Sequence, residues 1–497
     1  MVACVLLCGN AHADHLTIVA ANDTHSQIVP TSDGLGGMLR IRAVIDSVRA
    51  ANPQNLLTLH AGDAFQGSVY FTLYRGAVES AMIDSVGFDA IIVGNHEFDN
   101  GIESLAKYYG SMKAEKIGTN YDFSDTKLNG MFKPYLIRNY GEKRVAVIGI
   151  NIEPKGIISE NNVAGLRCLP AIEVADATAK YLKQVQKVDY VIMLSHIGYD
   201  ANESGLPGDI EIVKASHYID LVIGGHSHTV VKPGTPMSRV PNADGRMITI
   251  GQNGKAGKLL GLYDVDLETG DVRYKHISVD ATWDNKASTY RGVEEWLAPY
   301  SKGVDSLMNN PVGESVRAMS NKSAGLQNWV SDVSLEIVRK VSGINDIQFA
   351  IMNSGGIRVN MPQGIVSEGV LASMLPFDNK YMVLEISGAD LLDAFKVMAS
   401  RGGDCVSREV RVEFDKDANI ISAKLNGKQI KSDKKYKLVT IDYLANGGDY
   451  MIPLKNAKRL FVDDVKYECH ILDYVKSLTL NGKKIDSTEE RRMKLKK

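Results

Sequence analysis

The stretch IIVGNHEFD, residues 91–99, decides the fold of the first part of this 497-residue chain. An apolar run stops at Gly94, and polar side chains follow at once: Asn95, His96, Glu97 and Asp99. A packed core has no need for such an ending, whereas open α/β proteins bind ligands where their strands end. We therefore interpret the stretch as a buried strand that leads into a functional loop.

The same pattern recurs along the chain. Apolar runs alternate with helical segments such as residues 36–50, where apolar side chains have helical spacing. The other five runs are residues 16–23, 55–63, 144–151, 189–196 and 220–228. Strands that alternate with helices predict an α/β fold with a largely parallel sheet, whose strand ends gather their side chains at one edge.

Metal-binding side chains stand at five of the six strand ends. They are Asp23, His25, Asp63, Asn95, His96, His196, His226 and His228. A single loop histidine is more often an ordinary hydrogen-bonding residue, but this many equivalent placements indicate a metal centre. His60 precedes the end of its own strand, so we interpret it as a core residue.

The donor types predict the chemistry. Imidazoles, carboxylates and an amide without a thiolate suit divalent zinc, manganese, iron or cobalt. Eight donors exceed the needs of one tetrahedral ion, so we expect two ions bridged by a carboxylate. Such a pair binds phosphate and lowers the pKa of a bridging water. The expected reaction is hydrolysis of a phosphate ester by a metal-bridging hydroxide.

Five separated motifs resemble the calcineurin-like metallophosphatases, and specifically the 5'-nucleotidase family of bacteria and animals. In family order they are Asp23-x-His25, Gly62-Asp63, Gly94-Asn95-His96-Glu97, Ser195-His196 and Gly224-Gly225-His226-Ser227-His228. The resemblance implies a metallophosphatase βαβ sandwich at the N-terminus, followed by a second α/β domain of the 5'-nucleotidase C-terminal type.

The resemblance also implies roles for the site residues. Asp23, His25, Asp63 and His228 would bind one metal ion, and Asp63, Asn95, His196 and His226 the other, with Asp63 bridging. His96 would meet the phosphoryl oxygen rather than a metal ion. Asp99 would be the carboxylate that orients His96, or alternatively would cap a helix over residues 101–109.

In the C-terminal part the resemblance is carried by Asn353-Ser-Gly-Gly-Ile-Arg358, by residues 375–379 and by residues 443–449. It implies that Asn353 and Arg358 contact the nucleotide, that Tyr443 stacks on the base and that Asp449 holds the ribose hydroxyls. Without that context, a Gly-Gly turn before an arginine is more often only a turn. The family's second base-stacking aromatic is missing from residues 406–410, and Tyr450 replaces a glycine.

The expected domain layout has four parts: a signal peptide over residues 1–13, a metallophosphatase domain over 14–285, a connecting helix over 286–310 and a substrate-binding domain over 311–497. The signal peptide rests on a short apolar segment before Ala11-His12-Ala13. The basic residues that open such a peptide are missing, so we expect a truncated one. It predicts a periplasmic or secreted protein.

Composition limits the possible partners. A formal net charge of -2 and the lack of a basic stripe argue against nucleic acid as a partner. We also expect no membrane span and a monomer or weak dimer.

The sequence therefore predicts an exported phosphohydrolase that cleaves 5'-nucleotides to nucleoside and phosphate. One alternative keeps the chemistry but changes the substrate to nucleotide sugars, 2',3'-cyclic nucleotides or other organophosphates. The other is a protein that binds nucleotides or metals without catalysis.

Overall fold

The computed structural model describes residues 15–201 and 205–496, which form two compact units. The first unit runs to Pro154 and continues over Asn161–Pro299, and the second combines Lys155–Glu160 with the chain from Tyr300 onward. The border between the units falls inside helix α8 (Arg291–Met308), which lies where the sequence predicts a helix. The predicted signal segment lies outside the described residues.

The first unit contains two six-stranded sheets. One has the order β14 (Val272–Ser278), β13 (Leu259–Asp266), β1 (His15–Ala21), β2 (Leu56–His60), β3 (Ala90–Ile91) and β4 (Glu115–Lys116). The other has the order β11 (Arg239–Pro241), β12 (Met247–Gly251), β10 (Leu221–Ile223), β9 (Tyr190–His196), β7 (Lys143–Asn151) and β6 (Tyr135–Tyr140).

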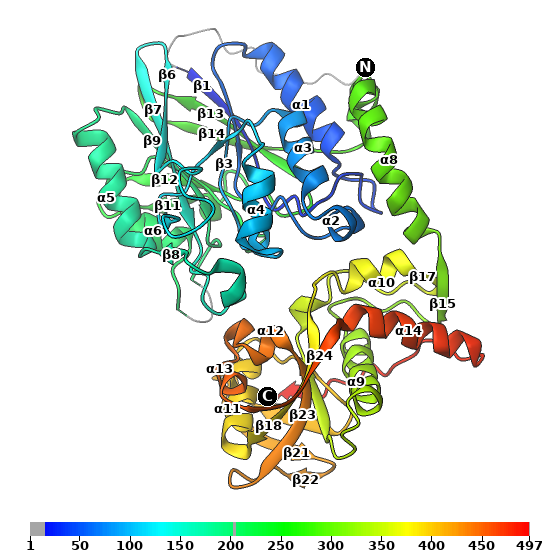
Figure 1. Ribbon diagram of the computed structural model, residues 1–497. Helices are drawn as coiled ribbons and strands as arrows, with labels where there is room; N and C mark the ends of the chain where they lie inside the picture. The colour runs from blue at the N-terminus through cyan, green and yellow to red at the C-terminus, as the bar shows by residue number, and fades with distance from the viewer. Residues whose placement is uncertain (1–14, 202–204, 497) are drawn as a thin grey trace. The chain divides into compact units, whose positions relative to one another are not determined.

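The two sheets pack face to face around one apolar core. Ile18 and Leu59 of the first sheet belong to the same buried cluster as Val147, Ile192 and Leu221 of the second. Helices cover the outer faces of this sandwich (Figure 1). On one side lie α1 (Met38–Ala51), α2 (Val69–Tyr74), α3 (Ala77–Val86) and α4 (Gly101–Tyr109), and on the other α5 (Ala171–Gln184) and α6 (Asp209–Ala215).

This arrangement confirms the predicted α/β sandwich and shows how its strands divide between the two sheets. The six predicted runs divide equally: β1, β2 and β3 pair in parallel in one sheet, and β7, β9 and β10 pair in parallel in the other. An apolar run buried on both faces shows that a strand is central, but it does not show which sheet the strand joins.

The register of the parallel strands brings their ends together. Ala21 pairs with His60, and His60 pairs with Ile91, so the loops that follow β1, β2 and β3 start side by side. In the other sheet, Ile223 of β10 pairs with Leu194 of β9. The residues that follow these ends are those that the sequence marks as metal donors.

The second unit is built on a mixed five-stranded sheet and a smaller four-stranded sheet. The larger has the order β19 (Cys405–Val406), β16 (Phe349–Met352), β23 (Lys435–Ile441), β18 (Lys380–Ser387) and β24 (Lys458–Lys466). The smaller has the order β22 (Lys428–Gln429), β21 (Ile420–Leu425), β20 (Val410–Phe414) and β25 (Met493–Leu495), and β15 (Pro311–Ser315) pairs separately with β17 (Gly364–Ser367).

The helices of this unit are α9 (Ala324–Val341), α10 (Glu368–Met374), α11 (Gly388–Ser400), α12 (Asp442–Ala445), α13 (Ile452–Lys455) and α14 (Tyr467–Leu480). Helix α9 packs its buried face, including Leu326 and Val338, into the same apolar cluster as Phe349 of β16. Among residues 15–201 and 205–496, no helix combines the length and the apolar character that crossing a bilayer requires.

A buried ion pair ties the C-terminal segment to α9. Both terminal nitrogens of Arg492 donate to the Asp332 carboxylate at 2.7 Å, and the side chains are only 5% and 14% exposed. The bidentate geometry compensates for the cost of burying both charges.

We predict that Arg492→Ala lowers the free energy of unfolding by about 3 kcal/mol, because it removes the bidentate partner of the mostly buried Asp332 carboxylate and leaves it only the weaker contacts with Arg408. Urea denaturation measures the change. Arg411→Ala is the matched control, since Arg411 pairs with Glu490 while 41% exposed and should cost less than about 1 kcal/mol. Equal losses in the two variants would contradict the role given to the buried pair.

Candidate metal centre

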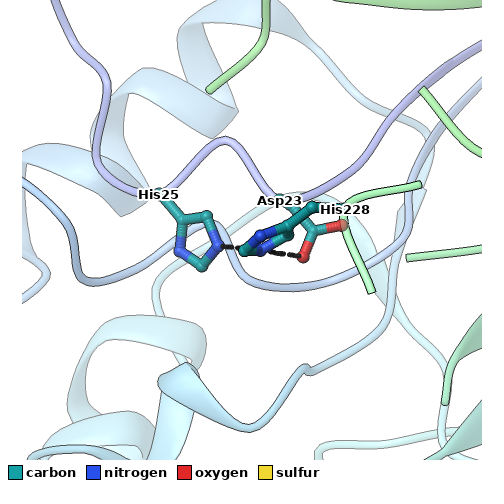
Figure 2. A group of neighbouring side chains, drawn as sticks. All are labelled: Asp23, His25 and His228. Carbon is teal, nitrogen blue, oxygen red and sulfur yellow. Dashed lines mark hydrogen bonds and ion pairs between the residues drawn. The ribbon is translucent and has the colours of Figure 1, made fainter. Parts of the chain in front are cut away.

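The first group of metal donors comes from the loops after β1 and β10. Nε2 of His228 lies 3.3 Å from Oδ1 of Asp23, and Nε2 of His25 lies 2.8 Å from Nε2 of His228 (Figure 2). Figure 2 shows the three side chains meeting tip to tip. They could each offer one ligand atom to a single ion, because these atoms lie within 4.8 Å of one another.

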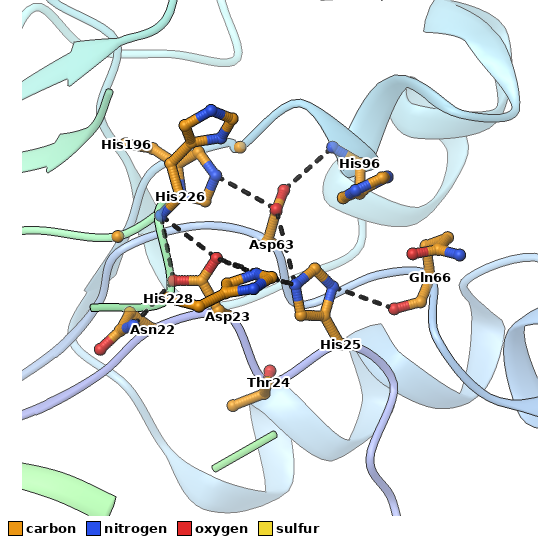
Figure 3. Close-up of polar contacts among 12 residues, drawn as sticks. Asn22, Asp23, Thr24, His25, Asp63, Gln66, His96, His196, His226 and His228 are labelled. Atoms are coloured by element: carbon orange, nitrogen blue, oxygen red, sulfur yellow. Dashed lines mark hydrogen bonds and ion pairs between the residues drawn. The ribbon is translucent and has the colours of Figure 1, made fainter. Parts of the chain in front are cut away.

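Asp63 stands at the centre of the remaining donors. It belongs to one group with His196 and His226 and to another with His25 and His96 (Figure 3). Oδ2 of Asp63 is 3.2 Å from Nε2 of His196 and 3.9 Å from Nε2 of His25. A carboxylate shared between two donor groups is the arrangement that a bridging ligand requires.

Asn95 completes the set of donors predicted from the sequence. Its amide Oδ1 lies 2.9 Å from Nδ1 of His226, beside the group that contains Asp63 and His196. The structure thus gathers all seven predicted ligand residues at one edge of the sandwich. Their assignment to particular ions stays a prediction.

The electrostatics of the donors fit cations. Nδ1 of His196 donates to the carbonyl oxygen of Ala61 at 2.7 Å, so in the neutral ring Nε2 carries a lone pair that faces the Asp63 carboxylate. Burial alone lowers the pKa of His196, but Asp63 and Asp23 reverse the effect and raise it to about 10. The two carboxylates therefore favour a positive charge beside them, which a divalent ion would supply.

The same conclusion follows from the two carboxylates. Burial raises the pKa of Asp63, yet the neighbouring histidines hold it well below its usual range. For Asp23, burial also opposes ionisation, and the hydrogen bond from His228 helps to lower its pKa to about 2. Both groups are thus anionic in a fully buried place, where charge must be compensated.

Five of the seven ligand residues have a left-handed backbone. The residues are Asp23 (φ 48°), His25 (φ 49°), Asp63 (φ 53°), His226 (φ 78°) and His228 (φ 56°). Residues other than glycine rarely adopt this conformation, which costs about 1–3 kcal/mol each and concentrates at functional sites. The turns that aim these side chains inward are therefore maintained at the expense of backbone strain.

Glu97 holds two of these loops in place, although the sequence pattern assigned it no role. Its buried carboxylate accepts hydrogen bonds from the backbone N–H groups of Asp63 (2.9 Å), Ala64 (2.7 Å) and Phe65 (3.1 Å), and from that of Gly94. The only signal in the sequence was its place within the motif. Burial and the charge of Asp63 raise the pKa of Glu97 to about 7.

His96 lies beside this set, with its ring oriented by Asp99. Nδ1 of His96 donates to Oδ2 of Asp99 at 2.9 Å, and the backbone N–H of His96 donates to Oδ1 of Asp63, also at 2.9 Å. The N-cap of α4 is Asn100, so the alternative in which Asp99 caps that helix is not what the structure has. His60 lies within β2, fully buried, with Nε2 3.0 Å from Oγ1 of Thr24.

Three of the four predicted nucleotide-binding residues meet in the second unit. Asp449 accepts a hydrogen bond from Nδ2 of Asn353 and another from the hydroxyl of Tyr443, both at 2.9 Å. The fourth residue, Arg358, has its guanidinium 5.9 Å from the ring centroid of Phe377.

Residues 406–410, where the sequence lacks the family's second aromatic, contribute a different contact. There Nε of Arg408 lies 3.4 Å from Oδ2 of Asp332. The Arg408 guanidinium is thus paired with a carboxylate of α9.

Comparison with known proteins defines the class of protein. Residues 16–230, which contain the whole donor set, match the family described as calcineurin-like phosphoesterase. The fold and the site are therefore those of a metal-dependent phosphoester hydrolase.

The second unit specifies the family. Residues 305–456 match the family described as 5'-nucleotidase, C-terminal domain. The chain thus combines a calcineurin-like phosphoesterase domain with a C-terminal domain of the 5'-nucleotidase type.

Individual relatives agree with this assignment. The human protein named 5'-nucleotidase is 25% identical over 88% of this chain and 84% of its own length. The trifunctional nucleotide phosphoesterase protein YfkN of Bacillus subtilis is 26% identical over 87% of this chain and 32% of its own length. The crystal structure of the 5'-nucleotidase precursor from Thermus thermophilus is 26% identical and has a TM-score of 0.84, covering 97% of this chain and 99% of that one.

We predict that Gly94→Ala abolishes metal retention and phosphatase activity. A Cβ atom at this position would overlap the Asp63 carboxylate and lie 2.7 Å from Nε2 of His196, so the donors could not keep their places. Metal content by elemental analysis and phosphate release measure the two effects. Gly292→Ala is the control, because a Cβ there meets nothing within 4 Å; a Gly94→Ala protein with normal metal content would refute the steric argument.

A buried acid behind the His25 loop predicts a pH dependence of stability. Glu79 is 2% exposed and accepts a hydrogen bond from the hydroxyl of Ser26, and burial raises its pKa from 4.5 to about 7. The folded chain keeps this proton up to about pH 7, whereas the unfolded chain loses it near pH 4.5. Stability is therefore lost as the pH rises through this range, by a term on the order of 3 kcal/mol.

Glu79→Gln should remove this term, so that the variant gains stability relative to the native chain between about pH 5 and roughly pH 7. Urea denaturation at several pH values measures it. The control is Glu103→Gln, since Glu103 is 76% exposed and pairs with Lys127. If the native chain and Glu79→Gln differ by the same amount at every pH, the buried acid is not the cause.

Proposed function

We propose that this chain hydrolyses 5'-nucleotides to nucleoside and inorganic phosphate with two divalent ions bound. The observation that carries the proposal is the shared position of Asp63 between two donor groups, in a chain that also has a 5'-nucleotidase C-terminal domain. The human relative named 5'-nucleotidase, aligned over most of both chains, supports the choice of substrate.

Each ion would be held by residues of the first unit. Asp23, His25, His228 and Asp63 would hold one, and Asp63, Asn95, His196 and His226 the other. Nitrogen and oxygen donors without a thiolate suit zinc, manganese, cobalt or iron. When bound, the ions would neutralise phosphate charge and lower the pKa of a water so that it can attack phosphorus.

His96 would act on the phosphoryl group rather than on an ion. Because Nδ1 is committed to Asp99, Nε2 is the ring nitrogen that would face the phosphoryl oxygens. The Asp99 carboxylate favours the cationic imidazole, which stabilises the charge that develops as the bond to the nucleoside 5'-oxygen breaks. The same proton can pass to that leaving oxygen.

The second unit would bind the nucleoside. Asn353 and Tyr443 both donate a hydrogen bond to Asp449. Asp449 has acceptor oxygens for ribose hydroxyls, the Tyr443 ring offers a face for the base, and Arg358 offers charge to the phosphate.

We also propose that the protein is exported and acts in the periplasm or outside the cell, as a monomer or weak dimer. Support comes from the apolar segment before Ala11-His12-Ala13. The Thermus relative is itself described as a precursor.

A second candidate keeps the chemistry and broadens the substrate. The Bacillus relative is named a trifunctional nucleotide phosphoesterase, so 2',3'-cyclic nucleotides and nucleotide sugars belong in the same assay. Preferential cleavage of either class over AMP would favour this candidate.

We predict metal-dependent phosphate release from AMP that disappears on chelation and returns with manganese, zinc or cobalt. His96→Ala should lower kcat by roughly 10²- to 10⁴-fold, because it removes an acid–base group while the metal donors remain. Colorimetric phosphate detection measures both. His217→Ala is the control, since His217 is 47% exposed and pairs with Asp244.

The outcomes separate the proposals. Release from p-nitrophenyl phosphate but from no nucleotide would retain the metal centre and reject the nucleotidase. A His96→Ala protein as active as His217→Ala would reject the role of His96, and no release with any metal would favour a binding protein.

A further inference from the structure

Three segments of the second unit converge on one ion pair, Arg401 with Asp404. Nη2 of Arg401 donates to Oδ2 of Asp404 at 2.9 Å, and the two side chains are 24% and 3% exposed. Arg401 and Asp404 lie between α11 and β19, and neither was marked by the sequence. The pair is therefore mostly withdrawn from solvent, where a charge needs a fixed partner.

Each member of the pair also holds a residue expected to bind nucleotide. Oδ1 of Asp404 accepts from the backbone N–H of Ser354 at 2.6 Å and so fixes the turn that starts at Asn353. Nη1 of Arg401 donates to the backbone carbonyl oxygen of Asp449. One ion pair thus links the loop after β16 to the loop after α12.

Arg401 binds the carbonyl oxygen of a strained peptide, the one that follows Asp449. Asp449 has φ 51° and Tyr450 has φ 57°, so two successive residues other than glycine are left-handed. Such residues persist only where their surroundings fix them. The carbonyl that Arg401 binds belongs to the peptide that joins these two residues, so the bond acts where the strain is.

The charges of Arg401 and Asp404 also affect Asp449. Burial raises the pKa of Asp449, the charge of Arg401 lowers it and the charge of Asp404 raises it. The charge of Arg401, which is paired with Asp404, therefore also acts on the Asp449 carboxylate and offsets the repulsion between the two acids. Without it, Asp404 and Asp449 would repel each other, and the Asn353 and Tyr443 contacts of Asp449 would have to hold it alone.

We propose that Arg401 and Asp404 are positioning residues that preset Asp449 and Asn353 to bind the hydroxyls of a nucleoside, and so select nucleotides over simple phosphate esters. This inference rests on the proposed function. It concerns affinity for the nucleoside part only, because the phosphoester chemistry belongs to the other unit.

The test compares AMP with p-nitrophenyl phosphate, which has no nucleoside. Arg401→Gln should lower the ratio of kcat/KM for AMP to that for p-nitrophenyl phosphate by about tenfold, mainly through KM for AMP, since one hydrogen bond to a charged group is lost. Asp404→Asn should act in the same direction. The double variant should lose less than the product of the two single effects, because both remove the same link.

The matched control is Arg411→Gln, an arginine of the same unit in an exposed ion pair with Glu490, which should leave the ratio unchanged. Arg401→Lys keeps the charge without the forked geometry and should fall between native and Arg401→Gln. If the thermal unfolding midpoint of Arg401→Gln shows that this variant does not fold, Arg401→Lys takes its place in the test. An Arg401→Lys or Arg401→Gln protein with the native ratio would overturn the inference.

A binding measurement separates this inference from the proposed function. Calorimetric titration of the chelated protein with adenosine, guanosine, cytidine and uridine reports the nucleoside site without turnover. If the native chain binds a nucleoside and Arg401→Gln binds it about tenfold more weakly, the inference holds even where no nucleotide is cleaved. If the native chain binds none of the four, the inference is overturned whatever the enzyme hydrolyses.

Discussion

Two buried carboxylates impose the constraint on which the first unit depends. Asp23 and Asp63 are 0% and 1% exposed, and both stay ionised because histidines surround them. Such charges would be intolerable in a core without compensation. The site is negatively charged and therefore suited to cations. The left-handed turns at the strand ends orient its side chains. The sandwich provides the rigid frame that keeps these strained turns in place.

The second unit uses the same principle with different means. There the buried acid Asp404 is compensated by Arg401, a resident cation of the chain, so that this site can be organised without a metal ion. The buried carboxylates of the first unit are suited to cations from solution, whereas Asp404 of the second unit is neutralised by an arginine of the same chain. This division fits the proposal that the chemistry and the recognition of the nucleoside are carried by different units.

The sequence was sufficient to predict that the residues after the strand ends lie close together. Asp23, His25 and His96 could be predicted because an apolar run that stops on polar residues identifies the loop they occupy. The role of Glu97 could not be predicted, because its carboxylate accepts hydrogen bonds from backbone N–H groups far away in the sequence. Every residue other than proline has such a group, so these bonds leave no pattern in the sequence. Arg401 was missed for the same reason. The sandwich was predicted from the family resemblance, but the assignment of each strand to one of its two sheets was not, since periodicity reports burial and not the neighbouring strand.

Glu97 has a consequence for how the ligand loops are held together. Many small metal-binding domains lose their fold when the ion leaves, because the ion alone holds the ligand loops together. Here a side chain of the protein already fastens the loop of Asp63 to the loop that begins at Gly94. Two of the ligand loops are therefore joined by the protein itself, so the binding of an ion does not have to bring them together.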